Sequence, residues 1–300
     1  MRLPEPYDLG WMLGFLADRA APALERVEPG LLVRVVRLAD VPSVLTVRHA
    51  PGAAPPRWLA VEATVAAQAP SGAGPVAGPA TAHLRRLLRR MFDLDTDLGP
   101  FHELARRDPL LGPLVARHPG LRLPQLPEPF EGAVRAIVGQ QVSVAAARTV
   151  VDRLIRHLGE PVAAAGRALF AFPRPAAMAA ASPERLAALG LTRAKVAALI
   201  AVAAATASGA VDWERLRGAA PEAARAALLA LPGIGPWTAS YIRMRALGDR
   251  DAFPAADLGV VKALAALSPR TAVASITGLA ERWRPYRAYA ALHLWRSLSP

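Results

Sequence analysis

The sequence predicts an α+β fold, in which a small antiparallel sheet near the N-terminus precedes a mostly α-helical remainder. Between residues 31 and 65, β-branched residues alternate with polar ones, and proline or glycine turns separate the runs. From residue 130 onward the chain is rich in alanine and leucine, and its breaks fall at glycine or proline. A chain of 300 residues is long enough for two or three domains with sizeable cores.

The N-terminal part is expected to hold one docking segment and three strands. Residues 7–19 (YDLGWMLGFLADR) are aromatic and apolar, which places Trp11, Met12 and Phe15 in a core. The strands are expected at 31–37, 44–48 and 58–65. Residues 68–79 are rich in proline, glycine and alanine and are interpreted as a linker or exposed loop. A helix over 81–92 follows, and its four arginines are expected to form a solvated face.

The remaining sequence is interpreted as a succession of helices with no internal repeat. The expected helices are 130–139, 142–158, 183–188, 194–208, 221–230, 237–247, 258–266, 276–282 and 285–298. This reading divides the chain into an N-terminal α/β subdomain (1–80), a connecting helical segment that packs with the C-terminal helices (81–128), a helical core (129–247) and the C-terminal helices (248–300).

Composition narrows the classes of function. Thirty-six lysines and arginines against 24 acidic residues give a net charge of +12, which favours a polyanionic partner. An arginine-rich proteome with high-GC coding would produce the same bias. The absence of cysteine excludes disulfides, thiol nucleophiles, zinc–thiolate sites and cysteine-ligated iron–sulfur clusters. We expect neither secretion nor membrane insertion, and hence a cytoplasmic protein, because no long apolar run is present.

The segment LPGIGPWTA (231–239) lies between two helix-forming stretches and predicts a helix-hairpin-helix. Gly233 and Gly235 permit left-handed backbone and leave no side chain in the way of an approaching ligand. Free backbone amides at the start of the second helix favour an anion, here a nucleic-acid phosphate. A plain helix–turn–helix connection without a ligand is the alternative, because glycine commonly terminates helices.

The segment DAFPAADLGVVK (251–262) places Asp257 where a new helix begins. Aspartate is a preferred N-cap residue, so a purely structural role is the simpler interpretation. The two roles are compatible, because the helix dipole favours negative charge at that position.

Four blocks in order resemble the helix-hairpin-helix DNA glycosylases, and within them the bacterial 3-methyladenine DNA glycosylase II type. The blocks are PYDLGWMLGFLADRA, PGLRLPQLPEPFEGAVRAIVGQQVSVAAA, LPGIGPWTASYIRMRALGDRDAFPAADLGVVK and ERWRPYRAYAALHLW. The resemblance implies a helix-hairpin-helix glycosylase core that flips alkylated bases, such as 3-methyladenine and 7-methylguanine, out of duplex DNA for base excision repair. It also implies double-stranded DNA as partner, association with the bacterial nucleoid on substrate, and a monomer.

The resemblance assigns the chemistry to Asp257, which matches the family's essential aspartate. A carboxylate there stabilises the oxocarbenium-like sugar that forms as the N-glycosidic bond breaks. In glycosylases that also cleave the strand, a lysine stands where this chain has Trp237. Tryptophan cannot form a Schiff base, so the enzyme is expected to be monofunctional. Trp237, Tyr241 and Trp295 are the expected base-binding aromatics, since an electron-rich face attracts a cationic base.

The resemblance also assigns DNA contacts and an ion site. Gln140 and Gln141 are expected to open a helix and to enter the minor groove. The nearest relatives carry a leucine wedge where this chain has Gln141. Gly233, Gly235 and Thr238 are expected to contact DNA phosphate. No cofactor is required, but a structural monovalent cation (Na⁺ or K⁺) is expected on the main-chain carbonyls of Leu229, Leu231 and Ile234.

Two other functions remain open at this stage. One is a glycosylase of the same fold for oxidised or deaminated bases, although several branches of that kind need the cysteine cluster or the lysine that this chain lacks. The other is a non-catalytic helix-hairpin-helix module that binds DNA, for which any residue at position 257 would suffice. Repair by thiol transfer is excluded because the chain has no cysteine.

Overall fold

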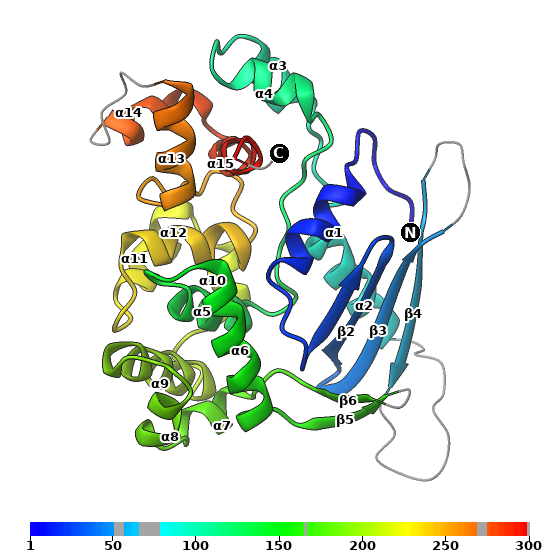
Figure 1. Cartoon of the computed structure of the whole chain (residues 1–300), viewed down its shortest axis with the longest axis vertical. Helices are drawn as coiled ribbons and strands as arrows, with labels where there is room; N and C mark the ends of the chain where they lie inside the picture. The colour runs from blue at the N-terminus through cyan, green and yellow to red at the C-terminus, as the bar shows by residue number, and fades with distance from the viewer. Residues whose placement is uncertain (51–56, 66–78, 165–166, 269–274, 299–300) are drawn as a thin grey trace.

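A computed structural model describes residues 1–50, 57–65, 79–164, 167–268 and 275–298 (Figure 1). It confirms the α+β fold class, with one four-stranded antiparallel sheet near the N-terminus and a mostly helical remainder. The linker expected at 68–79 falls almost wholly outside the described residues. None of the described helices combines the length and apolar character needed to cross a membrane.

The N-terminal sheet has its strands in chain order, each antiparallel to the next. The strands are β1 (Glu25–Glu28), β2 (Leu31–Leu38), β3 (Val41–His49) and β4 (Leu59–Val65). Helices α1 (Leu9–Ala17) and α2 (Pro79–Met91) share one buried cluster with the sheet. The three expected strands are confirmed. Strand β1 was not expected, because its sequence ERVE is mostly charged.

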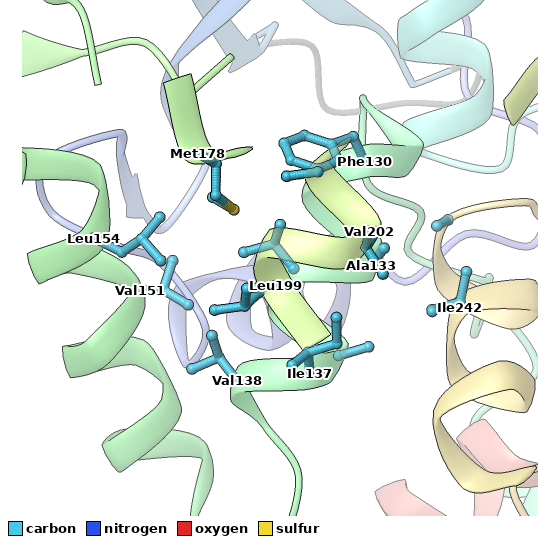
Figure 2. Close-up of a cluster of buried hydrophobic side chains, with 14 of the residues drawn as sticks. Phe130, Ala133, Ile137, Val138, Val151, Leu154, Met178, Leu199, Val202 and Ile242 are labelled. Carbon is cyan, nitrogen blue, oxygen red and sulfur yellow. The ribbon is translucent and has the colours of Figure 1, made fainter. Parts of the chain in front are cut away.

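The central helical part packs around a second cluster. Its helices are α5 (Pro129–Val138), α6 (Val144–Leu158), α7 (Pro175–Ala179), α8 (Pro183–Ala188), α9 (Arg193–Ala207), α10 (Trp213–Gly218), α11 (Pro221–Leu229) and α12 (Pro236–Arg245). Figure 2 shows Ile137, Val151 and Leu199 from three of these helices pointing toward one another. Alanine and leucine at helical spacing supply this interior, so composition and packing agree.

The third cluster joins two segments that are far apart in sequence. Helices α3 (Gly99–Arg106) and α4 (Leu111–Arg117) pack with α13 (Leu258–Leu267), α14 (Ile276–Ala280) and α15 (Arg287–Arg296). Phe101 from α3 lies between Tyr289 and His293 of α15. Helix α2, by contrast, buries its apolar residues against the sheet.

Two details of residues 130–298 differ from the expected succession of helices. Strands β5 (Pro161–Ala164) and β6 (Arg167–Phe170) pair antiparallel in a stretch for which no element had been expected. Phe170 N–H bonds to Ala23 O, so tertiary pairing outweighs local propensity. Helix α6 begins at Val144 with Ser143 as its N-cap, so Gln140 and Gln141 lie in the preceding turn and do not open the helix.

Candidate active site

The helix-hairpin-helix forms as expected, but its two glycines serve different purposes. Gly233 has φ +75°, and a Cβ there would lie 2.4 Å from the Cβ of Ala198. Gly235 has φ −89°, an ordinary extended backbone with open space around it, so the expected left-handed freedom is needed only at Gly233. Gly235 is the N-cap of α12 and offers no side chain to cap it. The backbone N–H groups of Gly233 and Gly235 donate to no residue in the described ranges. Both groups are therefore free to bind an anion.

Asp257 caps α13 and is held by four N–H donors. Its Oδ1 accepts from Gly259 N at 2.9 Å and Val260 N at 3.2 Å, as an N-cap does. Two tryptophan indoles add to this, because Trp295 Nε1 donates to Oδ1 at 2.9 Å and Trp237 Nε1 to Oδ2 at 3.1 Å. Three donors occupy Oδ1 and one occupies Oδ2, so Oδ2 is the oxygen with a free lone pair to offer a ligand.

The carboxylate faces a cavity of about 440 Å³ at the junction of the three buried clusters. The expected aromatics line it together: Trp237 and Tyr241 are stacked with centroids 5.3 Å apart, and Trp295 lies 6.4 Å from Tyr241. Phe15 of α1 stacks on Trp295, with the ring centroids 6.1 Å apart. The cavity is therefore wide enough for a purine and walled by rings, as a base-binding pocket requires.

Arginines form the wall of the cavity next to Tyr241. Arg245 Nη1 donates to the Tyr241 hydroxyl at 3.2 Å, and its Nε donates to Pro124 O. The Arg19 guanidinium lies 3.6 Å from the Phe15 ring centroid, and that of Arg245 lies 4.6 Å from the same ring. Burial, together with Arg19 and Arg135 nearby, lowers the pKa of Arg245 to about 10. This wall carries positive charge, whereas Asp257 carries negative charge.

The rim of the cavity combines cationic and exposed apolar side chains. Arg148 on α6 and Lys262 on α13 are exposed and line the opening. Val142, Leu258 and Leu298 line it too, and each is between 45% and 66% exposed. A rim of this composition matches the phosphates and apolar sugar edges of a nucleic acid.

The turn that carries Gln140 and Gln141 is tied to the hairpin. Gln140 Nε2 donates to Gly233 O and to Thr238 Oγ1, both at 2.9 Å. Lys195 Nζ donates to Gln140 O at 2.7 Å. The amide of Gln140 is therefore engaged within the protein and positions the turn. Gln141 is exposed at the tip with φ +55°, a conformation that is unusual for a residue other than glycine.

Thr238 and the hairpin carbonyls complete the residues expected from the sequence. Thr238 is only 2% exposed as a whole residue, and its Oγ1 accepts the hydrogen bond from Gln140, so its side chain is engaged within the protein. Leu231 O accepts from Ile234 N at 3.2 Å. Within the described ranges, the carbonyls of Leu229 and Ile234 receive no hydrogen bond. Carbonyl oxygens that accept no hydrogen bond are suitable ligands for a monovalent cation.

Comparison with known proteins places these features in a family. The sequence family of the AlkA N-terminal domain matches residues 1–127. The family of HhH-GPD superfamily base excision DNA repair proteins matches residues 134–284. The chain is 35% identical to DNA-3-methyladenine glycosylase 2 of Escherichia coli over 97% of this chain and 94% of the relative. The chain belongs to the HhH-GPD superfamily of base excision DNA repair proteins.

Two further proteins are similar to this chain over nearly its whole length. It is 37% identical over 99% of its length to a "probable bifunctional transcriptional activator/DNA repair enzyme" of Mycobacterium tuberculosis, of which it spans only 57%. A solved 3-methyladenine DNA-glycosylase from Archaeoglobus fulgidus has a TM-score of 0.83 at 23% identity, with 99% of this chain and 97% of that chain covered. This second likeness shows the fold. The family resemblance drawn from the four sequence blocks is confirmed.

Three residues at the cavity, Arg19, Arg245 and Gly259, were not predicted from the sequence. Arg245 follows Trp237 and Tyr241 at successive intervals of four, so helical spacing alone could have found it. Arg19 and Gly259 carried no such signal. A Cβ on Gly259 would lie 2.8 Å from Trp295 Cδ1 and 3.0 Å from Asp257 Oδ1, a closeness that only the folded chain reveals.

Proposed function

We propose that this protein is a monofunctional DNA glycosylase that excises alkylated bases, of the 3-methyladenine and 7-methylguanine type, from duplex DNA. The observation that carries the proposal is the placement of Asp257 in an aromatic cavity beside a hairpin with free backbone amides. The names of the relatives in Escherichia coli and Bacillus subtilis, both DNA-3-methyladenine glycosylases, point to the same substrates.

The geometry suggests how each part acts. Phosphate docks on the amides of Gly233 and Gly235 at the start of α12, and the rim cations hold the neighbouring backbone. The flipped base stacks against the rings of the cavity, where a cationic alkylated base gains about 0.5–2 kcal/mol from the aromatic faces. Asp257 Oδ2 then stabilises the positive sugar as the base leaves. Water captures C1′ and releases a proton.

Alkylation at N3 or N7 makes the base cationic, so it leaves as a neutral molecule and needs little acid catalysis. This accounts for a site in which one carboxylate is the central group. The carbonyls of Leu229, Leu231 and Ile234 would hold a monovalent cation, whose charge would help to anchor the same phosphate. The protein is proposed to act as a monomer, as the family resemblance implies.

The protein is proposed to leave the DNA strand intact. Trp237 occupies the position of the lysine in strand-cleaving relatives and offers an indole N–H to Asp257 instead of an amine. Incubation with damaged duplex and borohydride is therefore expected to trap no covalent protein–DNA adduct. A lysine-bearing glycosylase/lyase run in parallel serves as the positive control. A trapped adduct with this protein would contradict the monofunctional assignment.

The decisive experiment for the function is Asp257→Asn. Asparagine caps helices as well as aspartate does, so α13 is preserved while the charge is removed. Release of 3-methyladenine and 7-methylguanine from alkylated DNA, measured by chromatography, is expected to fall by at least about 10³-fold. Binding to undamaged duplex, measured by fluorescence anisotropy, is expected to change little.

The matched control is Asp212→Asn, which alters another capping aspartate, at the start of α10, that does not line the cavity. This variant is expected to keep wild-type turnover. Turnover near wild type in Asp257→Asn would refute the proposed function. Tight duplex binding by a wild-type protein that releases no base would favour the non-catalytic module.

A further inference from the structure

The hydroxyl of Tyr241 has a feature that stacking does not use. It accepts a hydrogen bond from Arg245 Nη1 at 3.2 Å, so its oxygen serves as an acceptor inside the protein. A phenol has one proton to donate. Within the described part of the chain, no acceptor for that proton lies within hydrogen-bond distance of Tyr241. Since Tyr241 lines the cavity, the proton is available to a ligand there.

The surroundings of Tyr241 make it an unusually good donor. Burial by itself would raise the pKa of its hydroxyl, but Arg245 and Arg19 outweigh burial and lower that pKa. A hydroxyl polarised by guanidinium groups gives up its proton more readily and forms stronger hydrogen bonds to a developing anion. The arrangement resembles an electrophilic group aimed at the base, while Asp257 addresses the sugar.

Charge decides which bases need such a group. When the N-glycosidic bond breaks, the bonding pair stays on the base. An alkylated cationic base thereby becomes neutral, whereas a neutral base becomes an anion until it takes up a proton. The water that attacks C1′ supplies a proton in both cases. Only the neutral base gains much from a donor in the cavity.

We propose that the Tyr241 hydroxyl, oriented by Arg245 and Arg19, donates a hydrogen bond to a lone pair of the flipped base and extends excision to neutral damaged purines. This inference rests on the proposed glycosylase function and deepens it. The stacking role expected from the sequence concerns the ring of Tyr241, whereas this role belongs to its hydroxyl. Arg245 and Arg19 act as positioning residues behind it.

The test is Tyr241→Phe, which keeps the ring and removes the hydroxyl. Excision is measured on two duplexes, one with hypoxanthine as the neutral base and one with 7-methylguanine as the cationic base. The variant is expected to lose about tenfold or more in kcat/KM on hypoxanthine and less than about threefold on 7-methylguanine. A folding defect would lower both equally, so the difference between the two substrates isolates the hydroxyl.

Two controls keep the result interpretable. Tyr286→Phe changes a half-buried tyrosine that does not line the cavity and is expected to leave both activities unchanged. Arg19→Met retains an apolar stem over Phe15 and is expected to lower hypoxanthine excision selectively. Equal losses on both bases, or no loss on hypoxanthine, in Tyr241→Phe would overturn the inference. If the wild type released neither base, the proposed function itself would fail.

Discussion

At the scale of single residues, Gly259 controls how closely Trp295 approaches Asp257. The indole packs over the first turn of α13, where a Cβ would lie 2.8 Å from Trp295 Cδ1 and 3.1 Å from Nε1. The same indole donates its N–H to the carboxylate at 2.9 Å. The missing side chain is therefore what allows one ring to line the cavity and to orient the carboxylate together.

Gly259→Ala is expected to lower kcat by about tenfold, or roughly 1.4 kcal/mol, with a smaller effect on KM. The added methyl group is expected to displace Trp295 and to loosen the carboxylate that is proposed to stabilise the sugar. Single-turnover base release and steady-state kinetics on 3-methyladenine-containing DNA measure the effect. Gly14→Ala is the matched control, because a Cβ there has open space in α1 and is expected to leave kcat unchanged. An unchanged kcat in Gly259→Ala would contradict this role.

At the scale of elements, the hairpin and the turn after α5 form one unit. Gln140 bridges to Gly233 O and Thr238 Oγ1, and Lys195 on α9 fixes the backbone of the turn through Val138 O and Gln140 O. The free amides of the hairpin and the exposed tip at Gln141 are thus held in a fixed relation. If a duplex docks on the hairpin as proposed, it would meet the tip without further ordering of the protein, which would lower the entropic cost of binding.

The two hairpin glycines are expected to respond differently to alanine. Gly233→Ala places a methyl group against Ala198 at φ +75° and should destabilise the fold by about 1–3 kcal/mol. Gly235→Ala has no such conflict and should leave the melting temperature unchanged while it weakens duplex binding several-fold. Thermal unfolding and fluorescence anisotropy separate the two effects. Unaltered binding in a stably folded Gly235→Ala would argue against phosphate contact at that amide.

At the scale of the whole molecule, buried charges join the sheet to the helical core. Arg34 on β2 pairs with Glu25 on β1 and with Glu131 on α5, and Arg135 pairs with both carboxylates. Burial opposes ionisation of Glu131, but Arg34 and Arg135 outweigh it and lower its pKa. Removing one of these four charged side chains would leave a buried charge without its partner. The loss in folding stability would be far greater than that from losing a surface ion pair.

The buried His293 and the half-buried Glu128 change the stability of the protein with pH in opposite directions. His293 lies in the third cluster, and neither ring nitrogen has a partner among the described residues; burial lowers its pKa to about 3. Burial raises the pKa of Glu128 to about 7, with nearby Glu131 adding to the shift. Between pH 3 and 6.5 the unfolded chain binds more protons at His293, so stability is lost as pH falls. At Glu128 the folded state binds more between pH 4.5 and 7, so stability is lost as pH rises.

Urea unfolding at pH 5 and pH 6.5 tests both groups. His293→Phe is expected to remove up to about 2 kcal/mol of the loss that His293 causes on acidification over this interval. Glu128→Gln is expected to change the pH dependence in the opposite sense, with its gain greatest at the higher pH. Curves for both variants that run parallel to the wild type would show that neither group titrates with folding.

Some parts of the site could be predicted because local pattern specifies them. Gly233, Trp237 and Asp257 lie within one stretch of 25 residues, and a hairpin followed by a capped helix is encoded by turn and capping residues. Gln140 was expected in the groove, yet its amide bonds to the hairpin 93 and 98 residues away. No periodicity signals a contact of that kind, because it depends on how two loops meet after the helices have packed.

The amino-acid sequence alone determined the sheet followed by helices, the two-glycine hairpin and the capping aspartate. Each of these follows from residues that are neighbours in the chain, where capping, turn preference and periodicity act, whereas the tryptophan in place of a lysine gained its meaning from the family resemblance. The tertiary structure alone decided that two indoles hold Asp257, that Arg19 and Arg245 polarise Tyr241, and that Pro161–Ala164 pairs with Arg167–Phe170. These depend on side chains brought together from α1, α12, α13 and α15 or on pairing with the N-terminal segment, and contacts over such separations exist only once the clusters pack.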